Sequence, residues 1–138
     1  MLFRSLITDA EELGLAGARA WAAARGRNAA TVLNCDGVDD AGSIQVMFSG
    51  RRPDRVLESV IRASRTSGVA HHPRRLALGI LTDSVALTDA GMAAVTFSRG
   101  SLRSLARVHS RRDDLAHLRG DGIGETAALL AATARELQ

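Results

Sequence analysis

Two adjacent carboxylates near the start of the chain are the residues best suited to chemistry. Glu11 and Glu12 follow the apolar segment 2–8 and lead into a run rich in alanine. Neighbouring glutamates repel each other unless a positive group lies beside them, and a metal ion supplies such a charge. One glutamate could bind the metal while the other accepts a proton from metal-bound water. The alternative is a solvated helix N-terminus, where the helix dipole favours glutamate.

Other polar residues suited to metal binding or acid–base chemistry lie further along the chain. Asp36 follows the apolar segment 30–35, and on its own it is more typical of a turn aspartate before Gly37. His109 lies in a polar, arginine-rich stretch, where the alternative is a solvated surface histidine. The remaining candidates are Asp83, Ser84, Asp113 and Asp114. The residue types alone leave these alternatives open.

In their order along the chain, these residues resemble metallopeptidase family 28, which comprises co-catalytic di-zinc aminopeptidases and their carboxypeptidase and glutaminyl-cyclase relatives. The resemblance is carried by Thr8-Asp9-x-Glu11-Glu12-x-Gly14-Leu15-x-Gly17-Ala18-Arg19, by Asn34-Cys35-Asp36, by Asp83 ahead of Gly91-Met92-Ala93-Ala94-Val95, and by Val108-His109-Ser110 with Asp113-Asp114. It covers nearly all of this chain, but only the C-terminal part of a typical family domain.

The resemblance implies a role for each matching residue. Glu11 aligns with the general base that deprotonates zinc-bound water, and Glu12 aligns with a zinc ligand. Asp36 aligns with a ligand of the second zinc, and His109 with a ligand of the same zinc as Glu12. The resemblance therefore implies Zn²⁺ as the cofactor and hydrolysis of a peptide bond as the reaction.

Two further matches concern the surroundings of the metal. Asp83-Ser84 corresponds to the family's Ser/Thr-Asp-His segment, with Ser84 in place of the histidine. This departure affects substrate contacts more than metal binding. Asp113 would hydrogen-bond or place the loop of His109, as residues around a metal ligand often do. We expect Asp83, Ser84 and Asp113 to line the pocket or to support the ligands.

The family's domain also has a His-x-Asp element and a bridging aspartate upstream of its Glu-Glu pair, and this sequence has no counterpart to them. One zinc would keep Glu12 and His109, and the other would keep Asp36 alone. Weak metal binding is expected, because catalytic zinc normally has three protein ligands and a water. Two functions stay open: a zinc-dependent aminopeptidase that hydrolyses N-terminal residues from peptides, and a non-catalytic homologue that binds a peptide or a partner.

Composition is typical of one globular domain spanning residues 1–138. The chain is 46% hydrophobic and 24% charged, with a net charge of +3 and 3% aromatic residues. So few aromatics make a nucleic-acid partner unexpected, and no apolar run approaches the roughly 20 residues of a membrane span. The single cysteine, Cys35, excludes an intrachain disulfide. This and the lack of a signal peptide are compatible with the cytoplasm, but the compartment stays open.

Hydrophobic periodicity predicts an α/β fold, a three-layer α/β/α sandwich on a mostly parallel sheet. By its resemblance, the fold would be that of a zinc aminopeptidase, N-terminally truncated. The expected strands are 2–8, 30–35, 43–49 and 93–97, with 76–81 short and extended. The expected helices are 11–25, 53–66, 84–89 (with Asp83 as N-cap) and 122–137.

The order strand 2–8, helix 11–25, strand 30–35 predicts a βαβ unit. It would place Glu11, Glu12 and Asp36 together at the carboxyl edge of a parallel sheet, where α/β folds keep their sites. The strand 43–49 could form a hairpin with 30–35. Cys35 is expected in the core, because neighbouring residues of a strand face opposite sides.

Met1 leads directly into an apolar segment, which predicts a domain that begins in its own interior. Missing upstream strands would expose a sheet edge and apolar surface, which a homodimer or a complementing chain would cover. The segment 71–75 is predicted to be a surface loop, because the adjacent histidines at its start diverge. The arginine pairs 51/52, 74/75 and 111/112 are dispersed and predict solvated faces or ion pairs.

Overall fold

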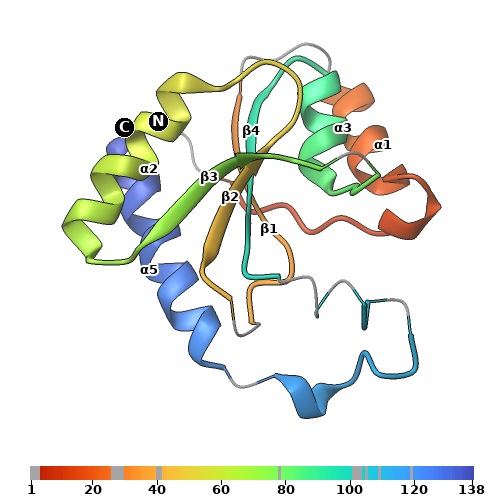
Figure 1. The fold of residues 1–138 in the computed structure, drawn as a ribbon. Coiled ribbons are helices and arrows are strands. Elements are labelled where there is room, and N and C mark those ends of the chain that lie inside the picture. The colour runs from red at the N-terminus through yellow and green to blue at the C-terminus, as the bar shows by residue number, and fades with distance from the viewer. Residues whose placement is uncertain are drawn as a thin grey trace.

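A mixed four-stranded sheet forms the middle layer of the protein, in the strand order β1-β4-β2-β3 (Figure 1). The computed structural model describes residues 4–25, 30–39, 42–77, 79–100, 104, 106–108, 110–118 and 120–138. The strands are β1 (Thr31–Cys35), β2 (Ile44–Phe48), β3 (His71–Arg75) and β4 (Ala93–Ser98). The strands predicted at 30–35, 43–49 and 93–97 are thereby confirmed, apart from their ends.

Helices cover both faces of this sheet. They are α1 (Ala16–Arg25), α2 (Asp54–Ser67), α3 (Asp83–Asp89) and α5 (Asp121–Glu136), with short 3₁₀ turns η1 (Glu11–Leu13) and η2 (Leu115–His117). α2 and α5 pack together on one face, and α1 and α3 pack on the other (Figure 1). The predicted three-layer α/β/α sandwich is confirmed. Within the described part of the chain, no helix has the length and apolarity needed to cross a bilayer.

The larger core lies between the sheet and the pair of α2 and α5. Ile44, Val46 and Phe48 are buried there, because a strand points alternate side chains to the same face. α2 buries an apolar stripe at helical spacing against them. The other buried members are Val56, Leu57, Val60, Ala63, Val95, Phe97, Leu129 and Ala132. The opposite face is packed by a smaller cluster around Ala22, Leu87, Met92 and Ala94.

Two of the three strand pairings are parallel. β1 pairs with β4 and β2 with β3 in parallel, whereas β2 and β4 run antiparallel. The predicted hairpin between 30–35 and 43–49 is wrong, because β4 lies between β1 and β2. Residues 94–97 of β4 are all buried, so this strand takes the central position that needs cover on both faces.

The N-terminal apolar segment does not extend the sheet. Residues 4–8, the described part of the predicted strand 2–8, form no strand. Ile7 is 96% exposed, and none of the described strands pairs with this segment. The βαβ unit predicted at 2–35 is therefore wrong. The βαβ unit that the sheet does contain is β2, α2 and β3.

The segment 71–75, predicted to be a loop, is the edge strand β3. Pro73 argues against a strand in the sequence, because proline cannot donate a backbone hydrogen bond. The Leu76 N–H donates to the Phe48 carbonyl at 2.9 Å, so the inward-facing N–H groups of this strand belong to even-numbered residues. Pro73 therefore faces outward, where its missing N–H removes no ladder hydrogen bond. Cys35 is also misplaced by the sequence analysis: it is exposed, as the last residue of the edge strand β1.

Candidate functional site

Asp36 lies directly after β1, at the carboxyl end of that strand. Side chains alternate along β1, so that Leu33 packs towards α2 and α5 while Val32 packs towards α1 and α3. The same alternation turns Asn34 and then Asp36 towards α1 and α3. The Asp36 N–H donates to the Phe97 carbonyl at 3.0 Å, which fixes the backbone at this point.

The carboxyl group of Asp36 meets two other carboxylates on this face. Its pKa is raised, chiefly by burial and further by the nearby Asp83 and Glu12. These neighbours come from the start of α3 and from η1, so three separate elements bring their acids to one place. The predicted convergence of Glu12 and Asp36 at the end of β1 is therefore present, although strand 2–8 is not.

Glu11 and Glu12 lie on a tight loop with an unusual backbone. Ala10 and Leu15 adopt left-handed φ angles of 57° and 63°, and Gly14 adopts 73°. Such a conformation costs a non-glycine residue roughly 1–3 kcal/mol. The predicted continuous helix 11–25 is wrong at this point, because the left-handed residues separate η1 from α1.

Packing compensates for the strain of this loop. Leu15 is fully buried with Ala18 and Ala86 between α1 and α3. The Gly17 N–H donates to the Asp9 carbonyl at 3.0 Å. A Cβ on Gly17 would lie 2.2 Å from the same oxygen, so only glycine allows this approach. The pattern Gly-Leu-x-Gly after the two glutamates is thus the set of residues that closes their loop.

Asp83 is the first residue of α3 and joins that helix to the segment before Glu11. The Thr8 hydroxyl donates to Asp83 Oδ2, while Asp83 Oδ1 is buried with no hydrogen-bond partner among the described residues. The expectation that Asp83 is the N-cap is wrong by one residue: Thr82 is the N-cap, and its side chain makes no capping hydrogen bond. The Asp83 carboxylate lies near that of Asp36.

Ser84 is buried among other hydroxyl side chains. It is 2% exposed, and its hydroxyl bonds to Thr82 at 2.9 Å and to Thr96 at 2.6 Å. Asn34 donates its side-chain N–H to the Thr96 hydroxyl at 3.2 Å, which joins β1, β4 and α3 in one buried polar network. The sequence analysis missed this network. Its only signal was a run of hydroxyl residues beside Asp83 and one in an otherwise apolar strand.

The third predicted ligand, His109, lies outside the described residues. Asp113 is exposed, and its N–H donates to the Ser110 carbonyl at 3.1 Å. Asp114 accepts from the Ala116 N–H at 2.9 Å and so caps η2. The aspartates downstream of His109 thus shape a turn in the loop between β4 and α5.

The sequence fits a known family along most of its length. The model of peptidase family M28 matches residues 3–134. The chain belongs to peptidase family M28. A comparison with curated proteins gave no match.

Solved aminopeptidases share the fold of this M28 chain. The zinc aminopeptidase BSAP of Bacillus subtilis is 21% identical with a TM-score of 0.77, over 94% of this chain and 34% of its own. For the LapA aminopeptidase of Legionella pneumophila these values are 18%, 0.74, 94% and 37%. For the aminopeptidase of Aneurinibacillus sp. strain AM-1 they are 20%, 0.71, 93% and 31%. The chain therefore spans about a third of the length of these proteins.

The donor chemistry of this M28 site suits a divalent cation such as zinc. Two carboxylates, those of Glu12 and Asp83, lie near Asp36, and Asp83 Oδ1 is a buried acceptor without a donor among the described residues. A cation would relieve both the repulsion and the unmet acceptor. Within the described ranges, however, no three His, Cys, Asp or Glu residues come close enough to hold one ion. Glu12, Asp36 and Asp83 therefore interact electrostatically without forming a finished coordination sphere.

Asp36→Asn should stabilise the metal-free M28 chain at neutral pH. Folding raises the pKa of Asp36, so the folded state disfavours the ionised carboxylate. Stability is then lost as the pH rises from the unfolded pKa, about 3.9, through the folded one. Asparagine removes this loss. Melting curves in chelator should show a higher Tm for the variant at neutral pH and no gain below about pH 3. A gain independent of pH, or an equal gain in the exposed Asp113→Asn, would contradict this account.

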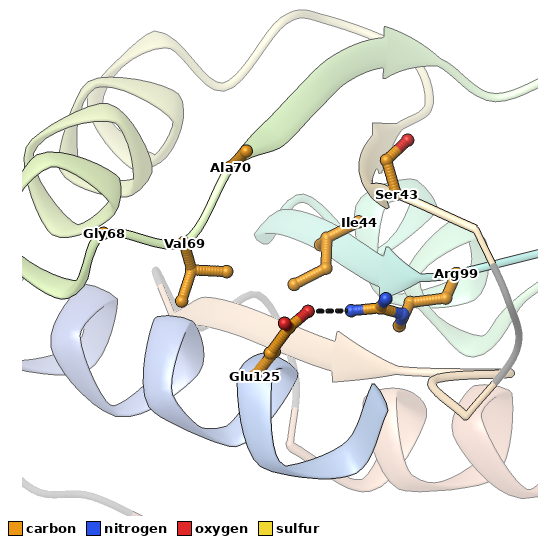
Figure 2. Close-up of a pocket in the computed structure, with 7 residues that line it drawn as sticks. All are labelled: Ser43, Ile44, Gly68, Val69, Ala70, Arg99 and Glu125. Carbon is orange, nitrogen blue, oxygen red and sulfur yellow. Dashed lines mark hydrogen bonds and ion pairs between the residues drawn. The ribbon is translucent and has the colours of Figure 1, made fainter. Parts of the chain in front are cut away.

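A separate recess of about 300 Å³ lies at the start of β2 (Figure 2). Figure 2 shows Glu125 of α5 reaching towards Arg99, and the two side chains form an ion pair at 2.5 Å. The lining residues are Ser43, Ile44, Gly68, Val69, Ala70, Arg99 and Glu125. None of them belongs to the carboxylate site. Because the charge of Arg99 is already met by Glu125, we assign this recess no part in the chemistry.

Proposed function

We propose that this chain contributes the base Glu11 and the three metal ligands Glu12, Asp36 and His109 to a zinc-dependent aminopeptidase site, which removes N-terminal residues from peptides. The observation that supports it is the convergence of Glu12 and Asp36 at the end of β1, next to the strained loop that presents Glu11. Strain held at a loop of this kind is typical of functional sites.

Each residue has a chemical role in this proposal. Glu12 and His109 would hold one zinc and Asp36 would be a ligand of the second; zinc, when bound, lowers the pKa of water and polarises the scissile carbonyl. Glu11 would accept the proton of the attacking water and return it to the leaving amine. Asp83, held by Thr8, would keep the glutamate loop against Asp36. A second copy of the chain or another polypeptide would complete the coordination.

A non-catalytic homologue that binds a peptide or a partner is the second candidate. Two observations favour it. The described residues include no three-ligand group. Ser84, which stands where the family pattern has histidine, is turned into the buried network and leaves no side chain there to contact a substrate.

Zinc content separates the two candidates. The chain would be loaded with zinc, desalted and measured by elemental analysis, together with Glu12→Ala and the control Glu58→Ala. Glu58 is an exposed glutamate on α2, away from the site. Stoichiometric zinc in the wild type and in the control, lost in Glu12→Ala, supports the aminopeptidase site. Near-zero zinc in all three supports the non-catalytic homologue. Sedimentation of the loaded sample would then show whether a dimer holds the metal.

A further inference from the structure

Part of one sheet face lies uncovered next to the carboxylate site. On the side to which Asp36 points, α1 and α3 pack against β1 and β4. β2 and β3 present four side chains to the same side, which are those of Gln45, Met47, His72 and Arg74. Gln45 and Met47 are half-buried, whereas His72 and Arg74 are exposed. This part of the face is therefore open to a ligand.

Strand alternation determines which side chains of β3 face this side. Phe48 of β2 belongs to the core under α2 and α5, and the guanidinium carbon of Arg75 lies 5.3 Å from the centroid of its ring. Arg75 is therefore on the side of α2 and α5. His72 and Arg74 have the opposite parity along the strand, so they face the side of α1 and α3.

The strand register places three polar residues in line with Asp36. Ser98 of β4 is opposite Gln45 of β2, and Gln45 is opposite His72 of β3. The register of β1 and β4, continued by one residue, brings Asp36 beside Ser98. We call Asp36, Ser98, Gln45 and His72 the cross-strand row. It crosses all four strands on one face of the sheet.

The two middle members of the cross-strand row can bind a peptide backbone. The Gly100 N–H donates to the Ser98 hydroxyl at 3.4 Å, and the Gln45 side-chain N–H donates to the Ser43 hydroxyl at 3.0 Å. Among the described residues, no donor bonds to Gln45 Oε1 and no acceptor takes the Ser98 hydroxyl hydrogen. An acceptor and a donor are thus left for the amide groups of a ligand.

The two ends of the cross-strand row have opposite electrostatic character. Asp36 lies near the carboxylates of Glu12 and Asp83 at one end. At the other end Arg74 is two residues from His72 on the same face, and it forms no ion pair or hydrogen bond with any described residue. A peptide with a free N-terminus and a carboxylate further along has the complementary separation of charge.

The length of the cross-strand row sets the length of peptide that fits. Three strand spacings of about 4.8 Å each separate β1 from β3, so the ends are on the order of 14 Å apart. An extended chain rises about 3.4 Å per residue, so about four residues span this distance.

We propose that the cross-strand row binds an extended peptide whose N-terminus lies at the carboxylates. His72 and Arg74 hold a carboxylate about four residues further along, because imidazole N–H and guanidinium groups donate hydrogen bonds to carboxylate oxygens. The inference rests on the proposed function in taking a peptide as the ligand. It adds the class of peptide: short chains with a carboxylate near the fourth residue, either a free C-terminus or an acidic side chain.

The test is an NMR titration of the isotope-labelled chain with tetraalanine in the presence of chelator. Without metal the peptide is not cleaved, so binding is measured apart from activity. Amide shifts should change at Gln45, His72 and Ser98. Tetraalanine amide, which lacks the terminal charge, should bind about fivefold more weakly. Dialanine is too short to span the row and should bind no more tightly than this amide.

The peptide Ala-Ala-Ala-Glu amide separates the two sources of the carboxylate. Affinity equal to that of tetraalanine would mean that an acidic side chain serves at the fourth position. Affinity equal to that of tetraalanine amide would mean that only a free C-terminus is held. Either result supports a carboxylate site at His72 and Arg74, provided that tetraalanine itself binds more tightly than its amide.

Arg74→Ala should weaken binding of tetraalanine about fivefold and leave the affinity for tetraalanine amide unchanged, because only the acid uses the charge of Arg74. The matched control is Arg55→Ala, which removes the same charge from an exposed residue of α2 on the other side of the sheet. It should alter either affinity less than about twofold. Because Arg74 is exposed and unbonded among the described residues, its variant should fold like the wild type.

Three results would overturn the proposal. One is the absence of shift changes at the cross-strand row when tetraalanine is added to the wild type. Another is equal affinity for the acid and the amide. The third is an equal loss of affinity for both peptides in Arg74→Ala. Failure of the proposed aminopeptidase function appears separately, as absence of zinc from the loaded chain, and leaves these peptide shifts unchanged.

Discussion

Gly17→Ala should destabilise the chain by about 3 kcal/mol, although alanine is ordinarily the better helix former. Gly17 is the second residue of α1 and has an ordinary helical backbone. A Cβ at this position would lie 2.2 Å from the Asp9 carbonyl oxygen and 2.8 Å from the Asp9 nitrogen. Both are backbone atoms, so the loop that carries Glu11 and Glu12 must move to admit a methyl group.

Urea denaturation of Gly17→Ala and of Gly124→Ala measures this effect against a matched control. Gly124 lies in α5, and a Cβ there would meet no atom within 4 Å. That substitution should raise the free energy of unfolding by about 0.5–1 kcal/mol, because alanine loses less backbone entropy than glycine. Equal shifts of the same sign would mean that the approach of Asp9 to Gly17 does not constrain the loop.

Glu11→Gln should lower kcat by roughly 10³-fold while the zinc content stays that of the wild type. This expectation rests on the proposed function. Glutamine keeps the shape of glutamate but accepts no proton, so the attacking water would lose its base. The measurement is turnover of a panel of aminoacyl p-nitroanilides by zinc-loaded protein, with metal determined on the same samples.

Glu12→Gln is the matched control for this experiment, because it removes one carboxylate from the neighbouring residue. It should lose zinc and activity together, whereas Glu11→Gln should lose activity alone. An active, zinc-loaded Glu11→Gln protein with an unchanged rate would show that the base is another residue. No turnover by the wild type at saturating zinc, for any substrate of the panel, would favour the non-catalytic homologue.

The sequence correctly predicted those helices and strands whose hydrophobic pattern matches the packing that they have in the fold. The alternation of β2 and the helical stripe of α2, which begins after Pro53 and ends at Gly68, gave boundaries close to those observed. The structure departs from the prediction where a long-range contact determines the conformation of a segment. Pro73 argued against a strand, and only the place of β3 at the edge of the sheet makes the proline harmless. Residues 4–8 have a strand-like composition, but no neighbouring strand pairs with them.

The sequence by itself determined the family and the three layers, because these depend on residue type, order and period, and it supplied Glu11, Glu12 and Asp36 as candidates for the site. Tertiary structure alone decided which groups meet. It brought Asp83 to Asp36, turned Ser84 into the buried network, and placed Arg52 and Arg75 over the Phe48 ring. The physical reason is that charge repulsion, desolvation and hydrogen bonding depend on distances between side chains. Those distances are set by strand order and helix packing, which no local pattern specifies.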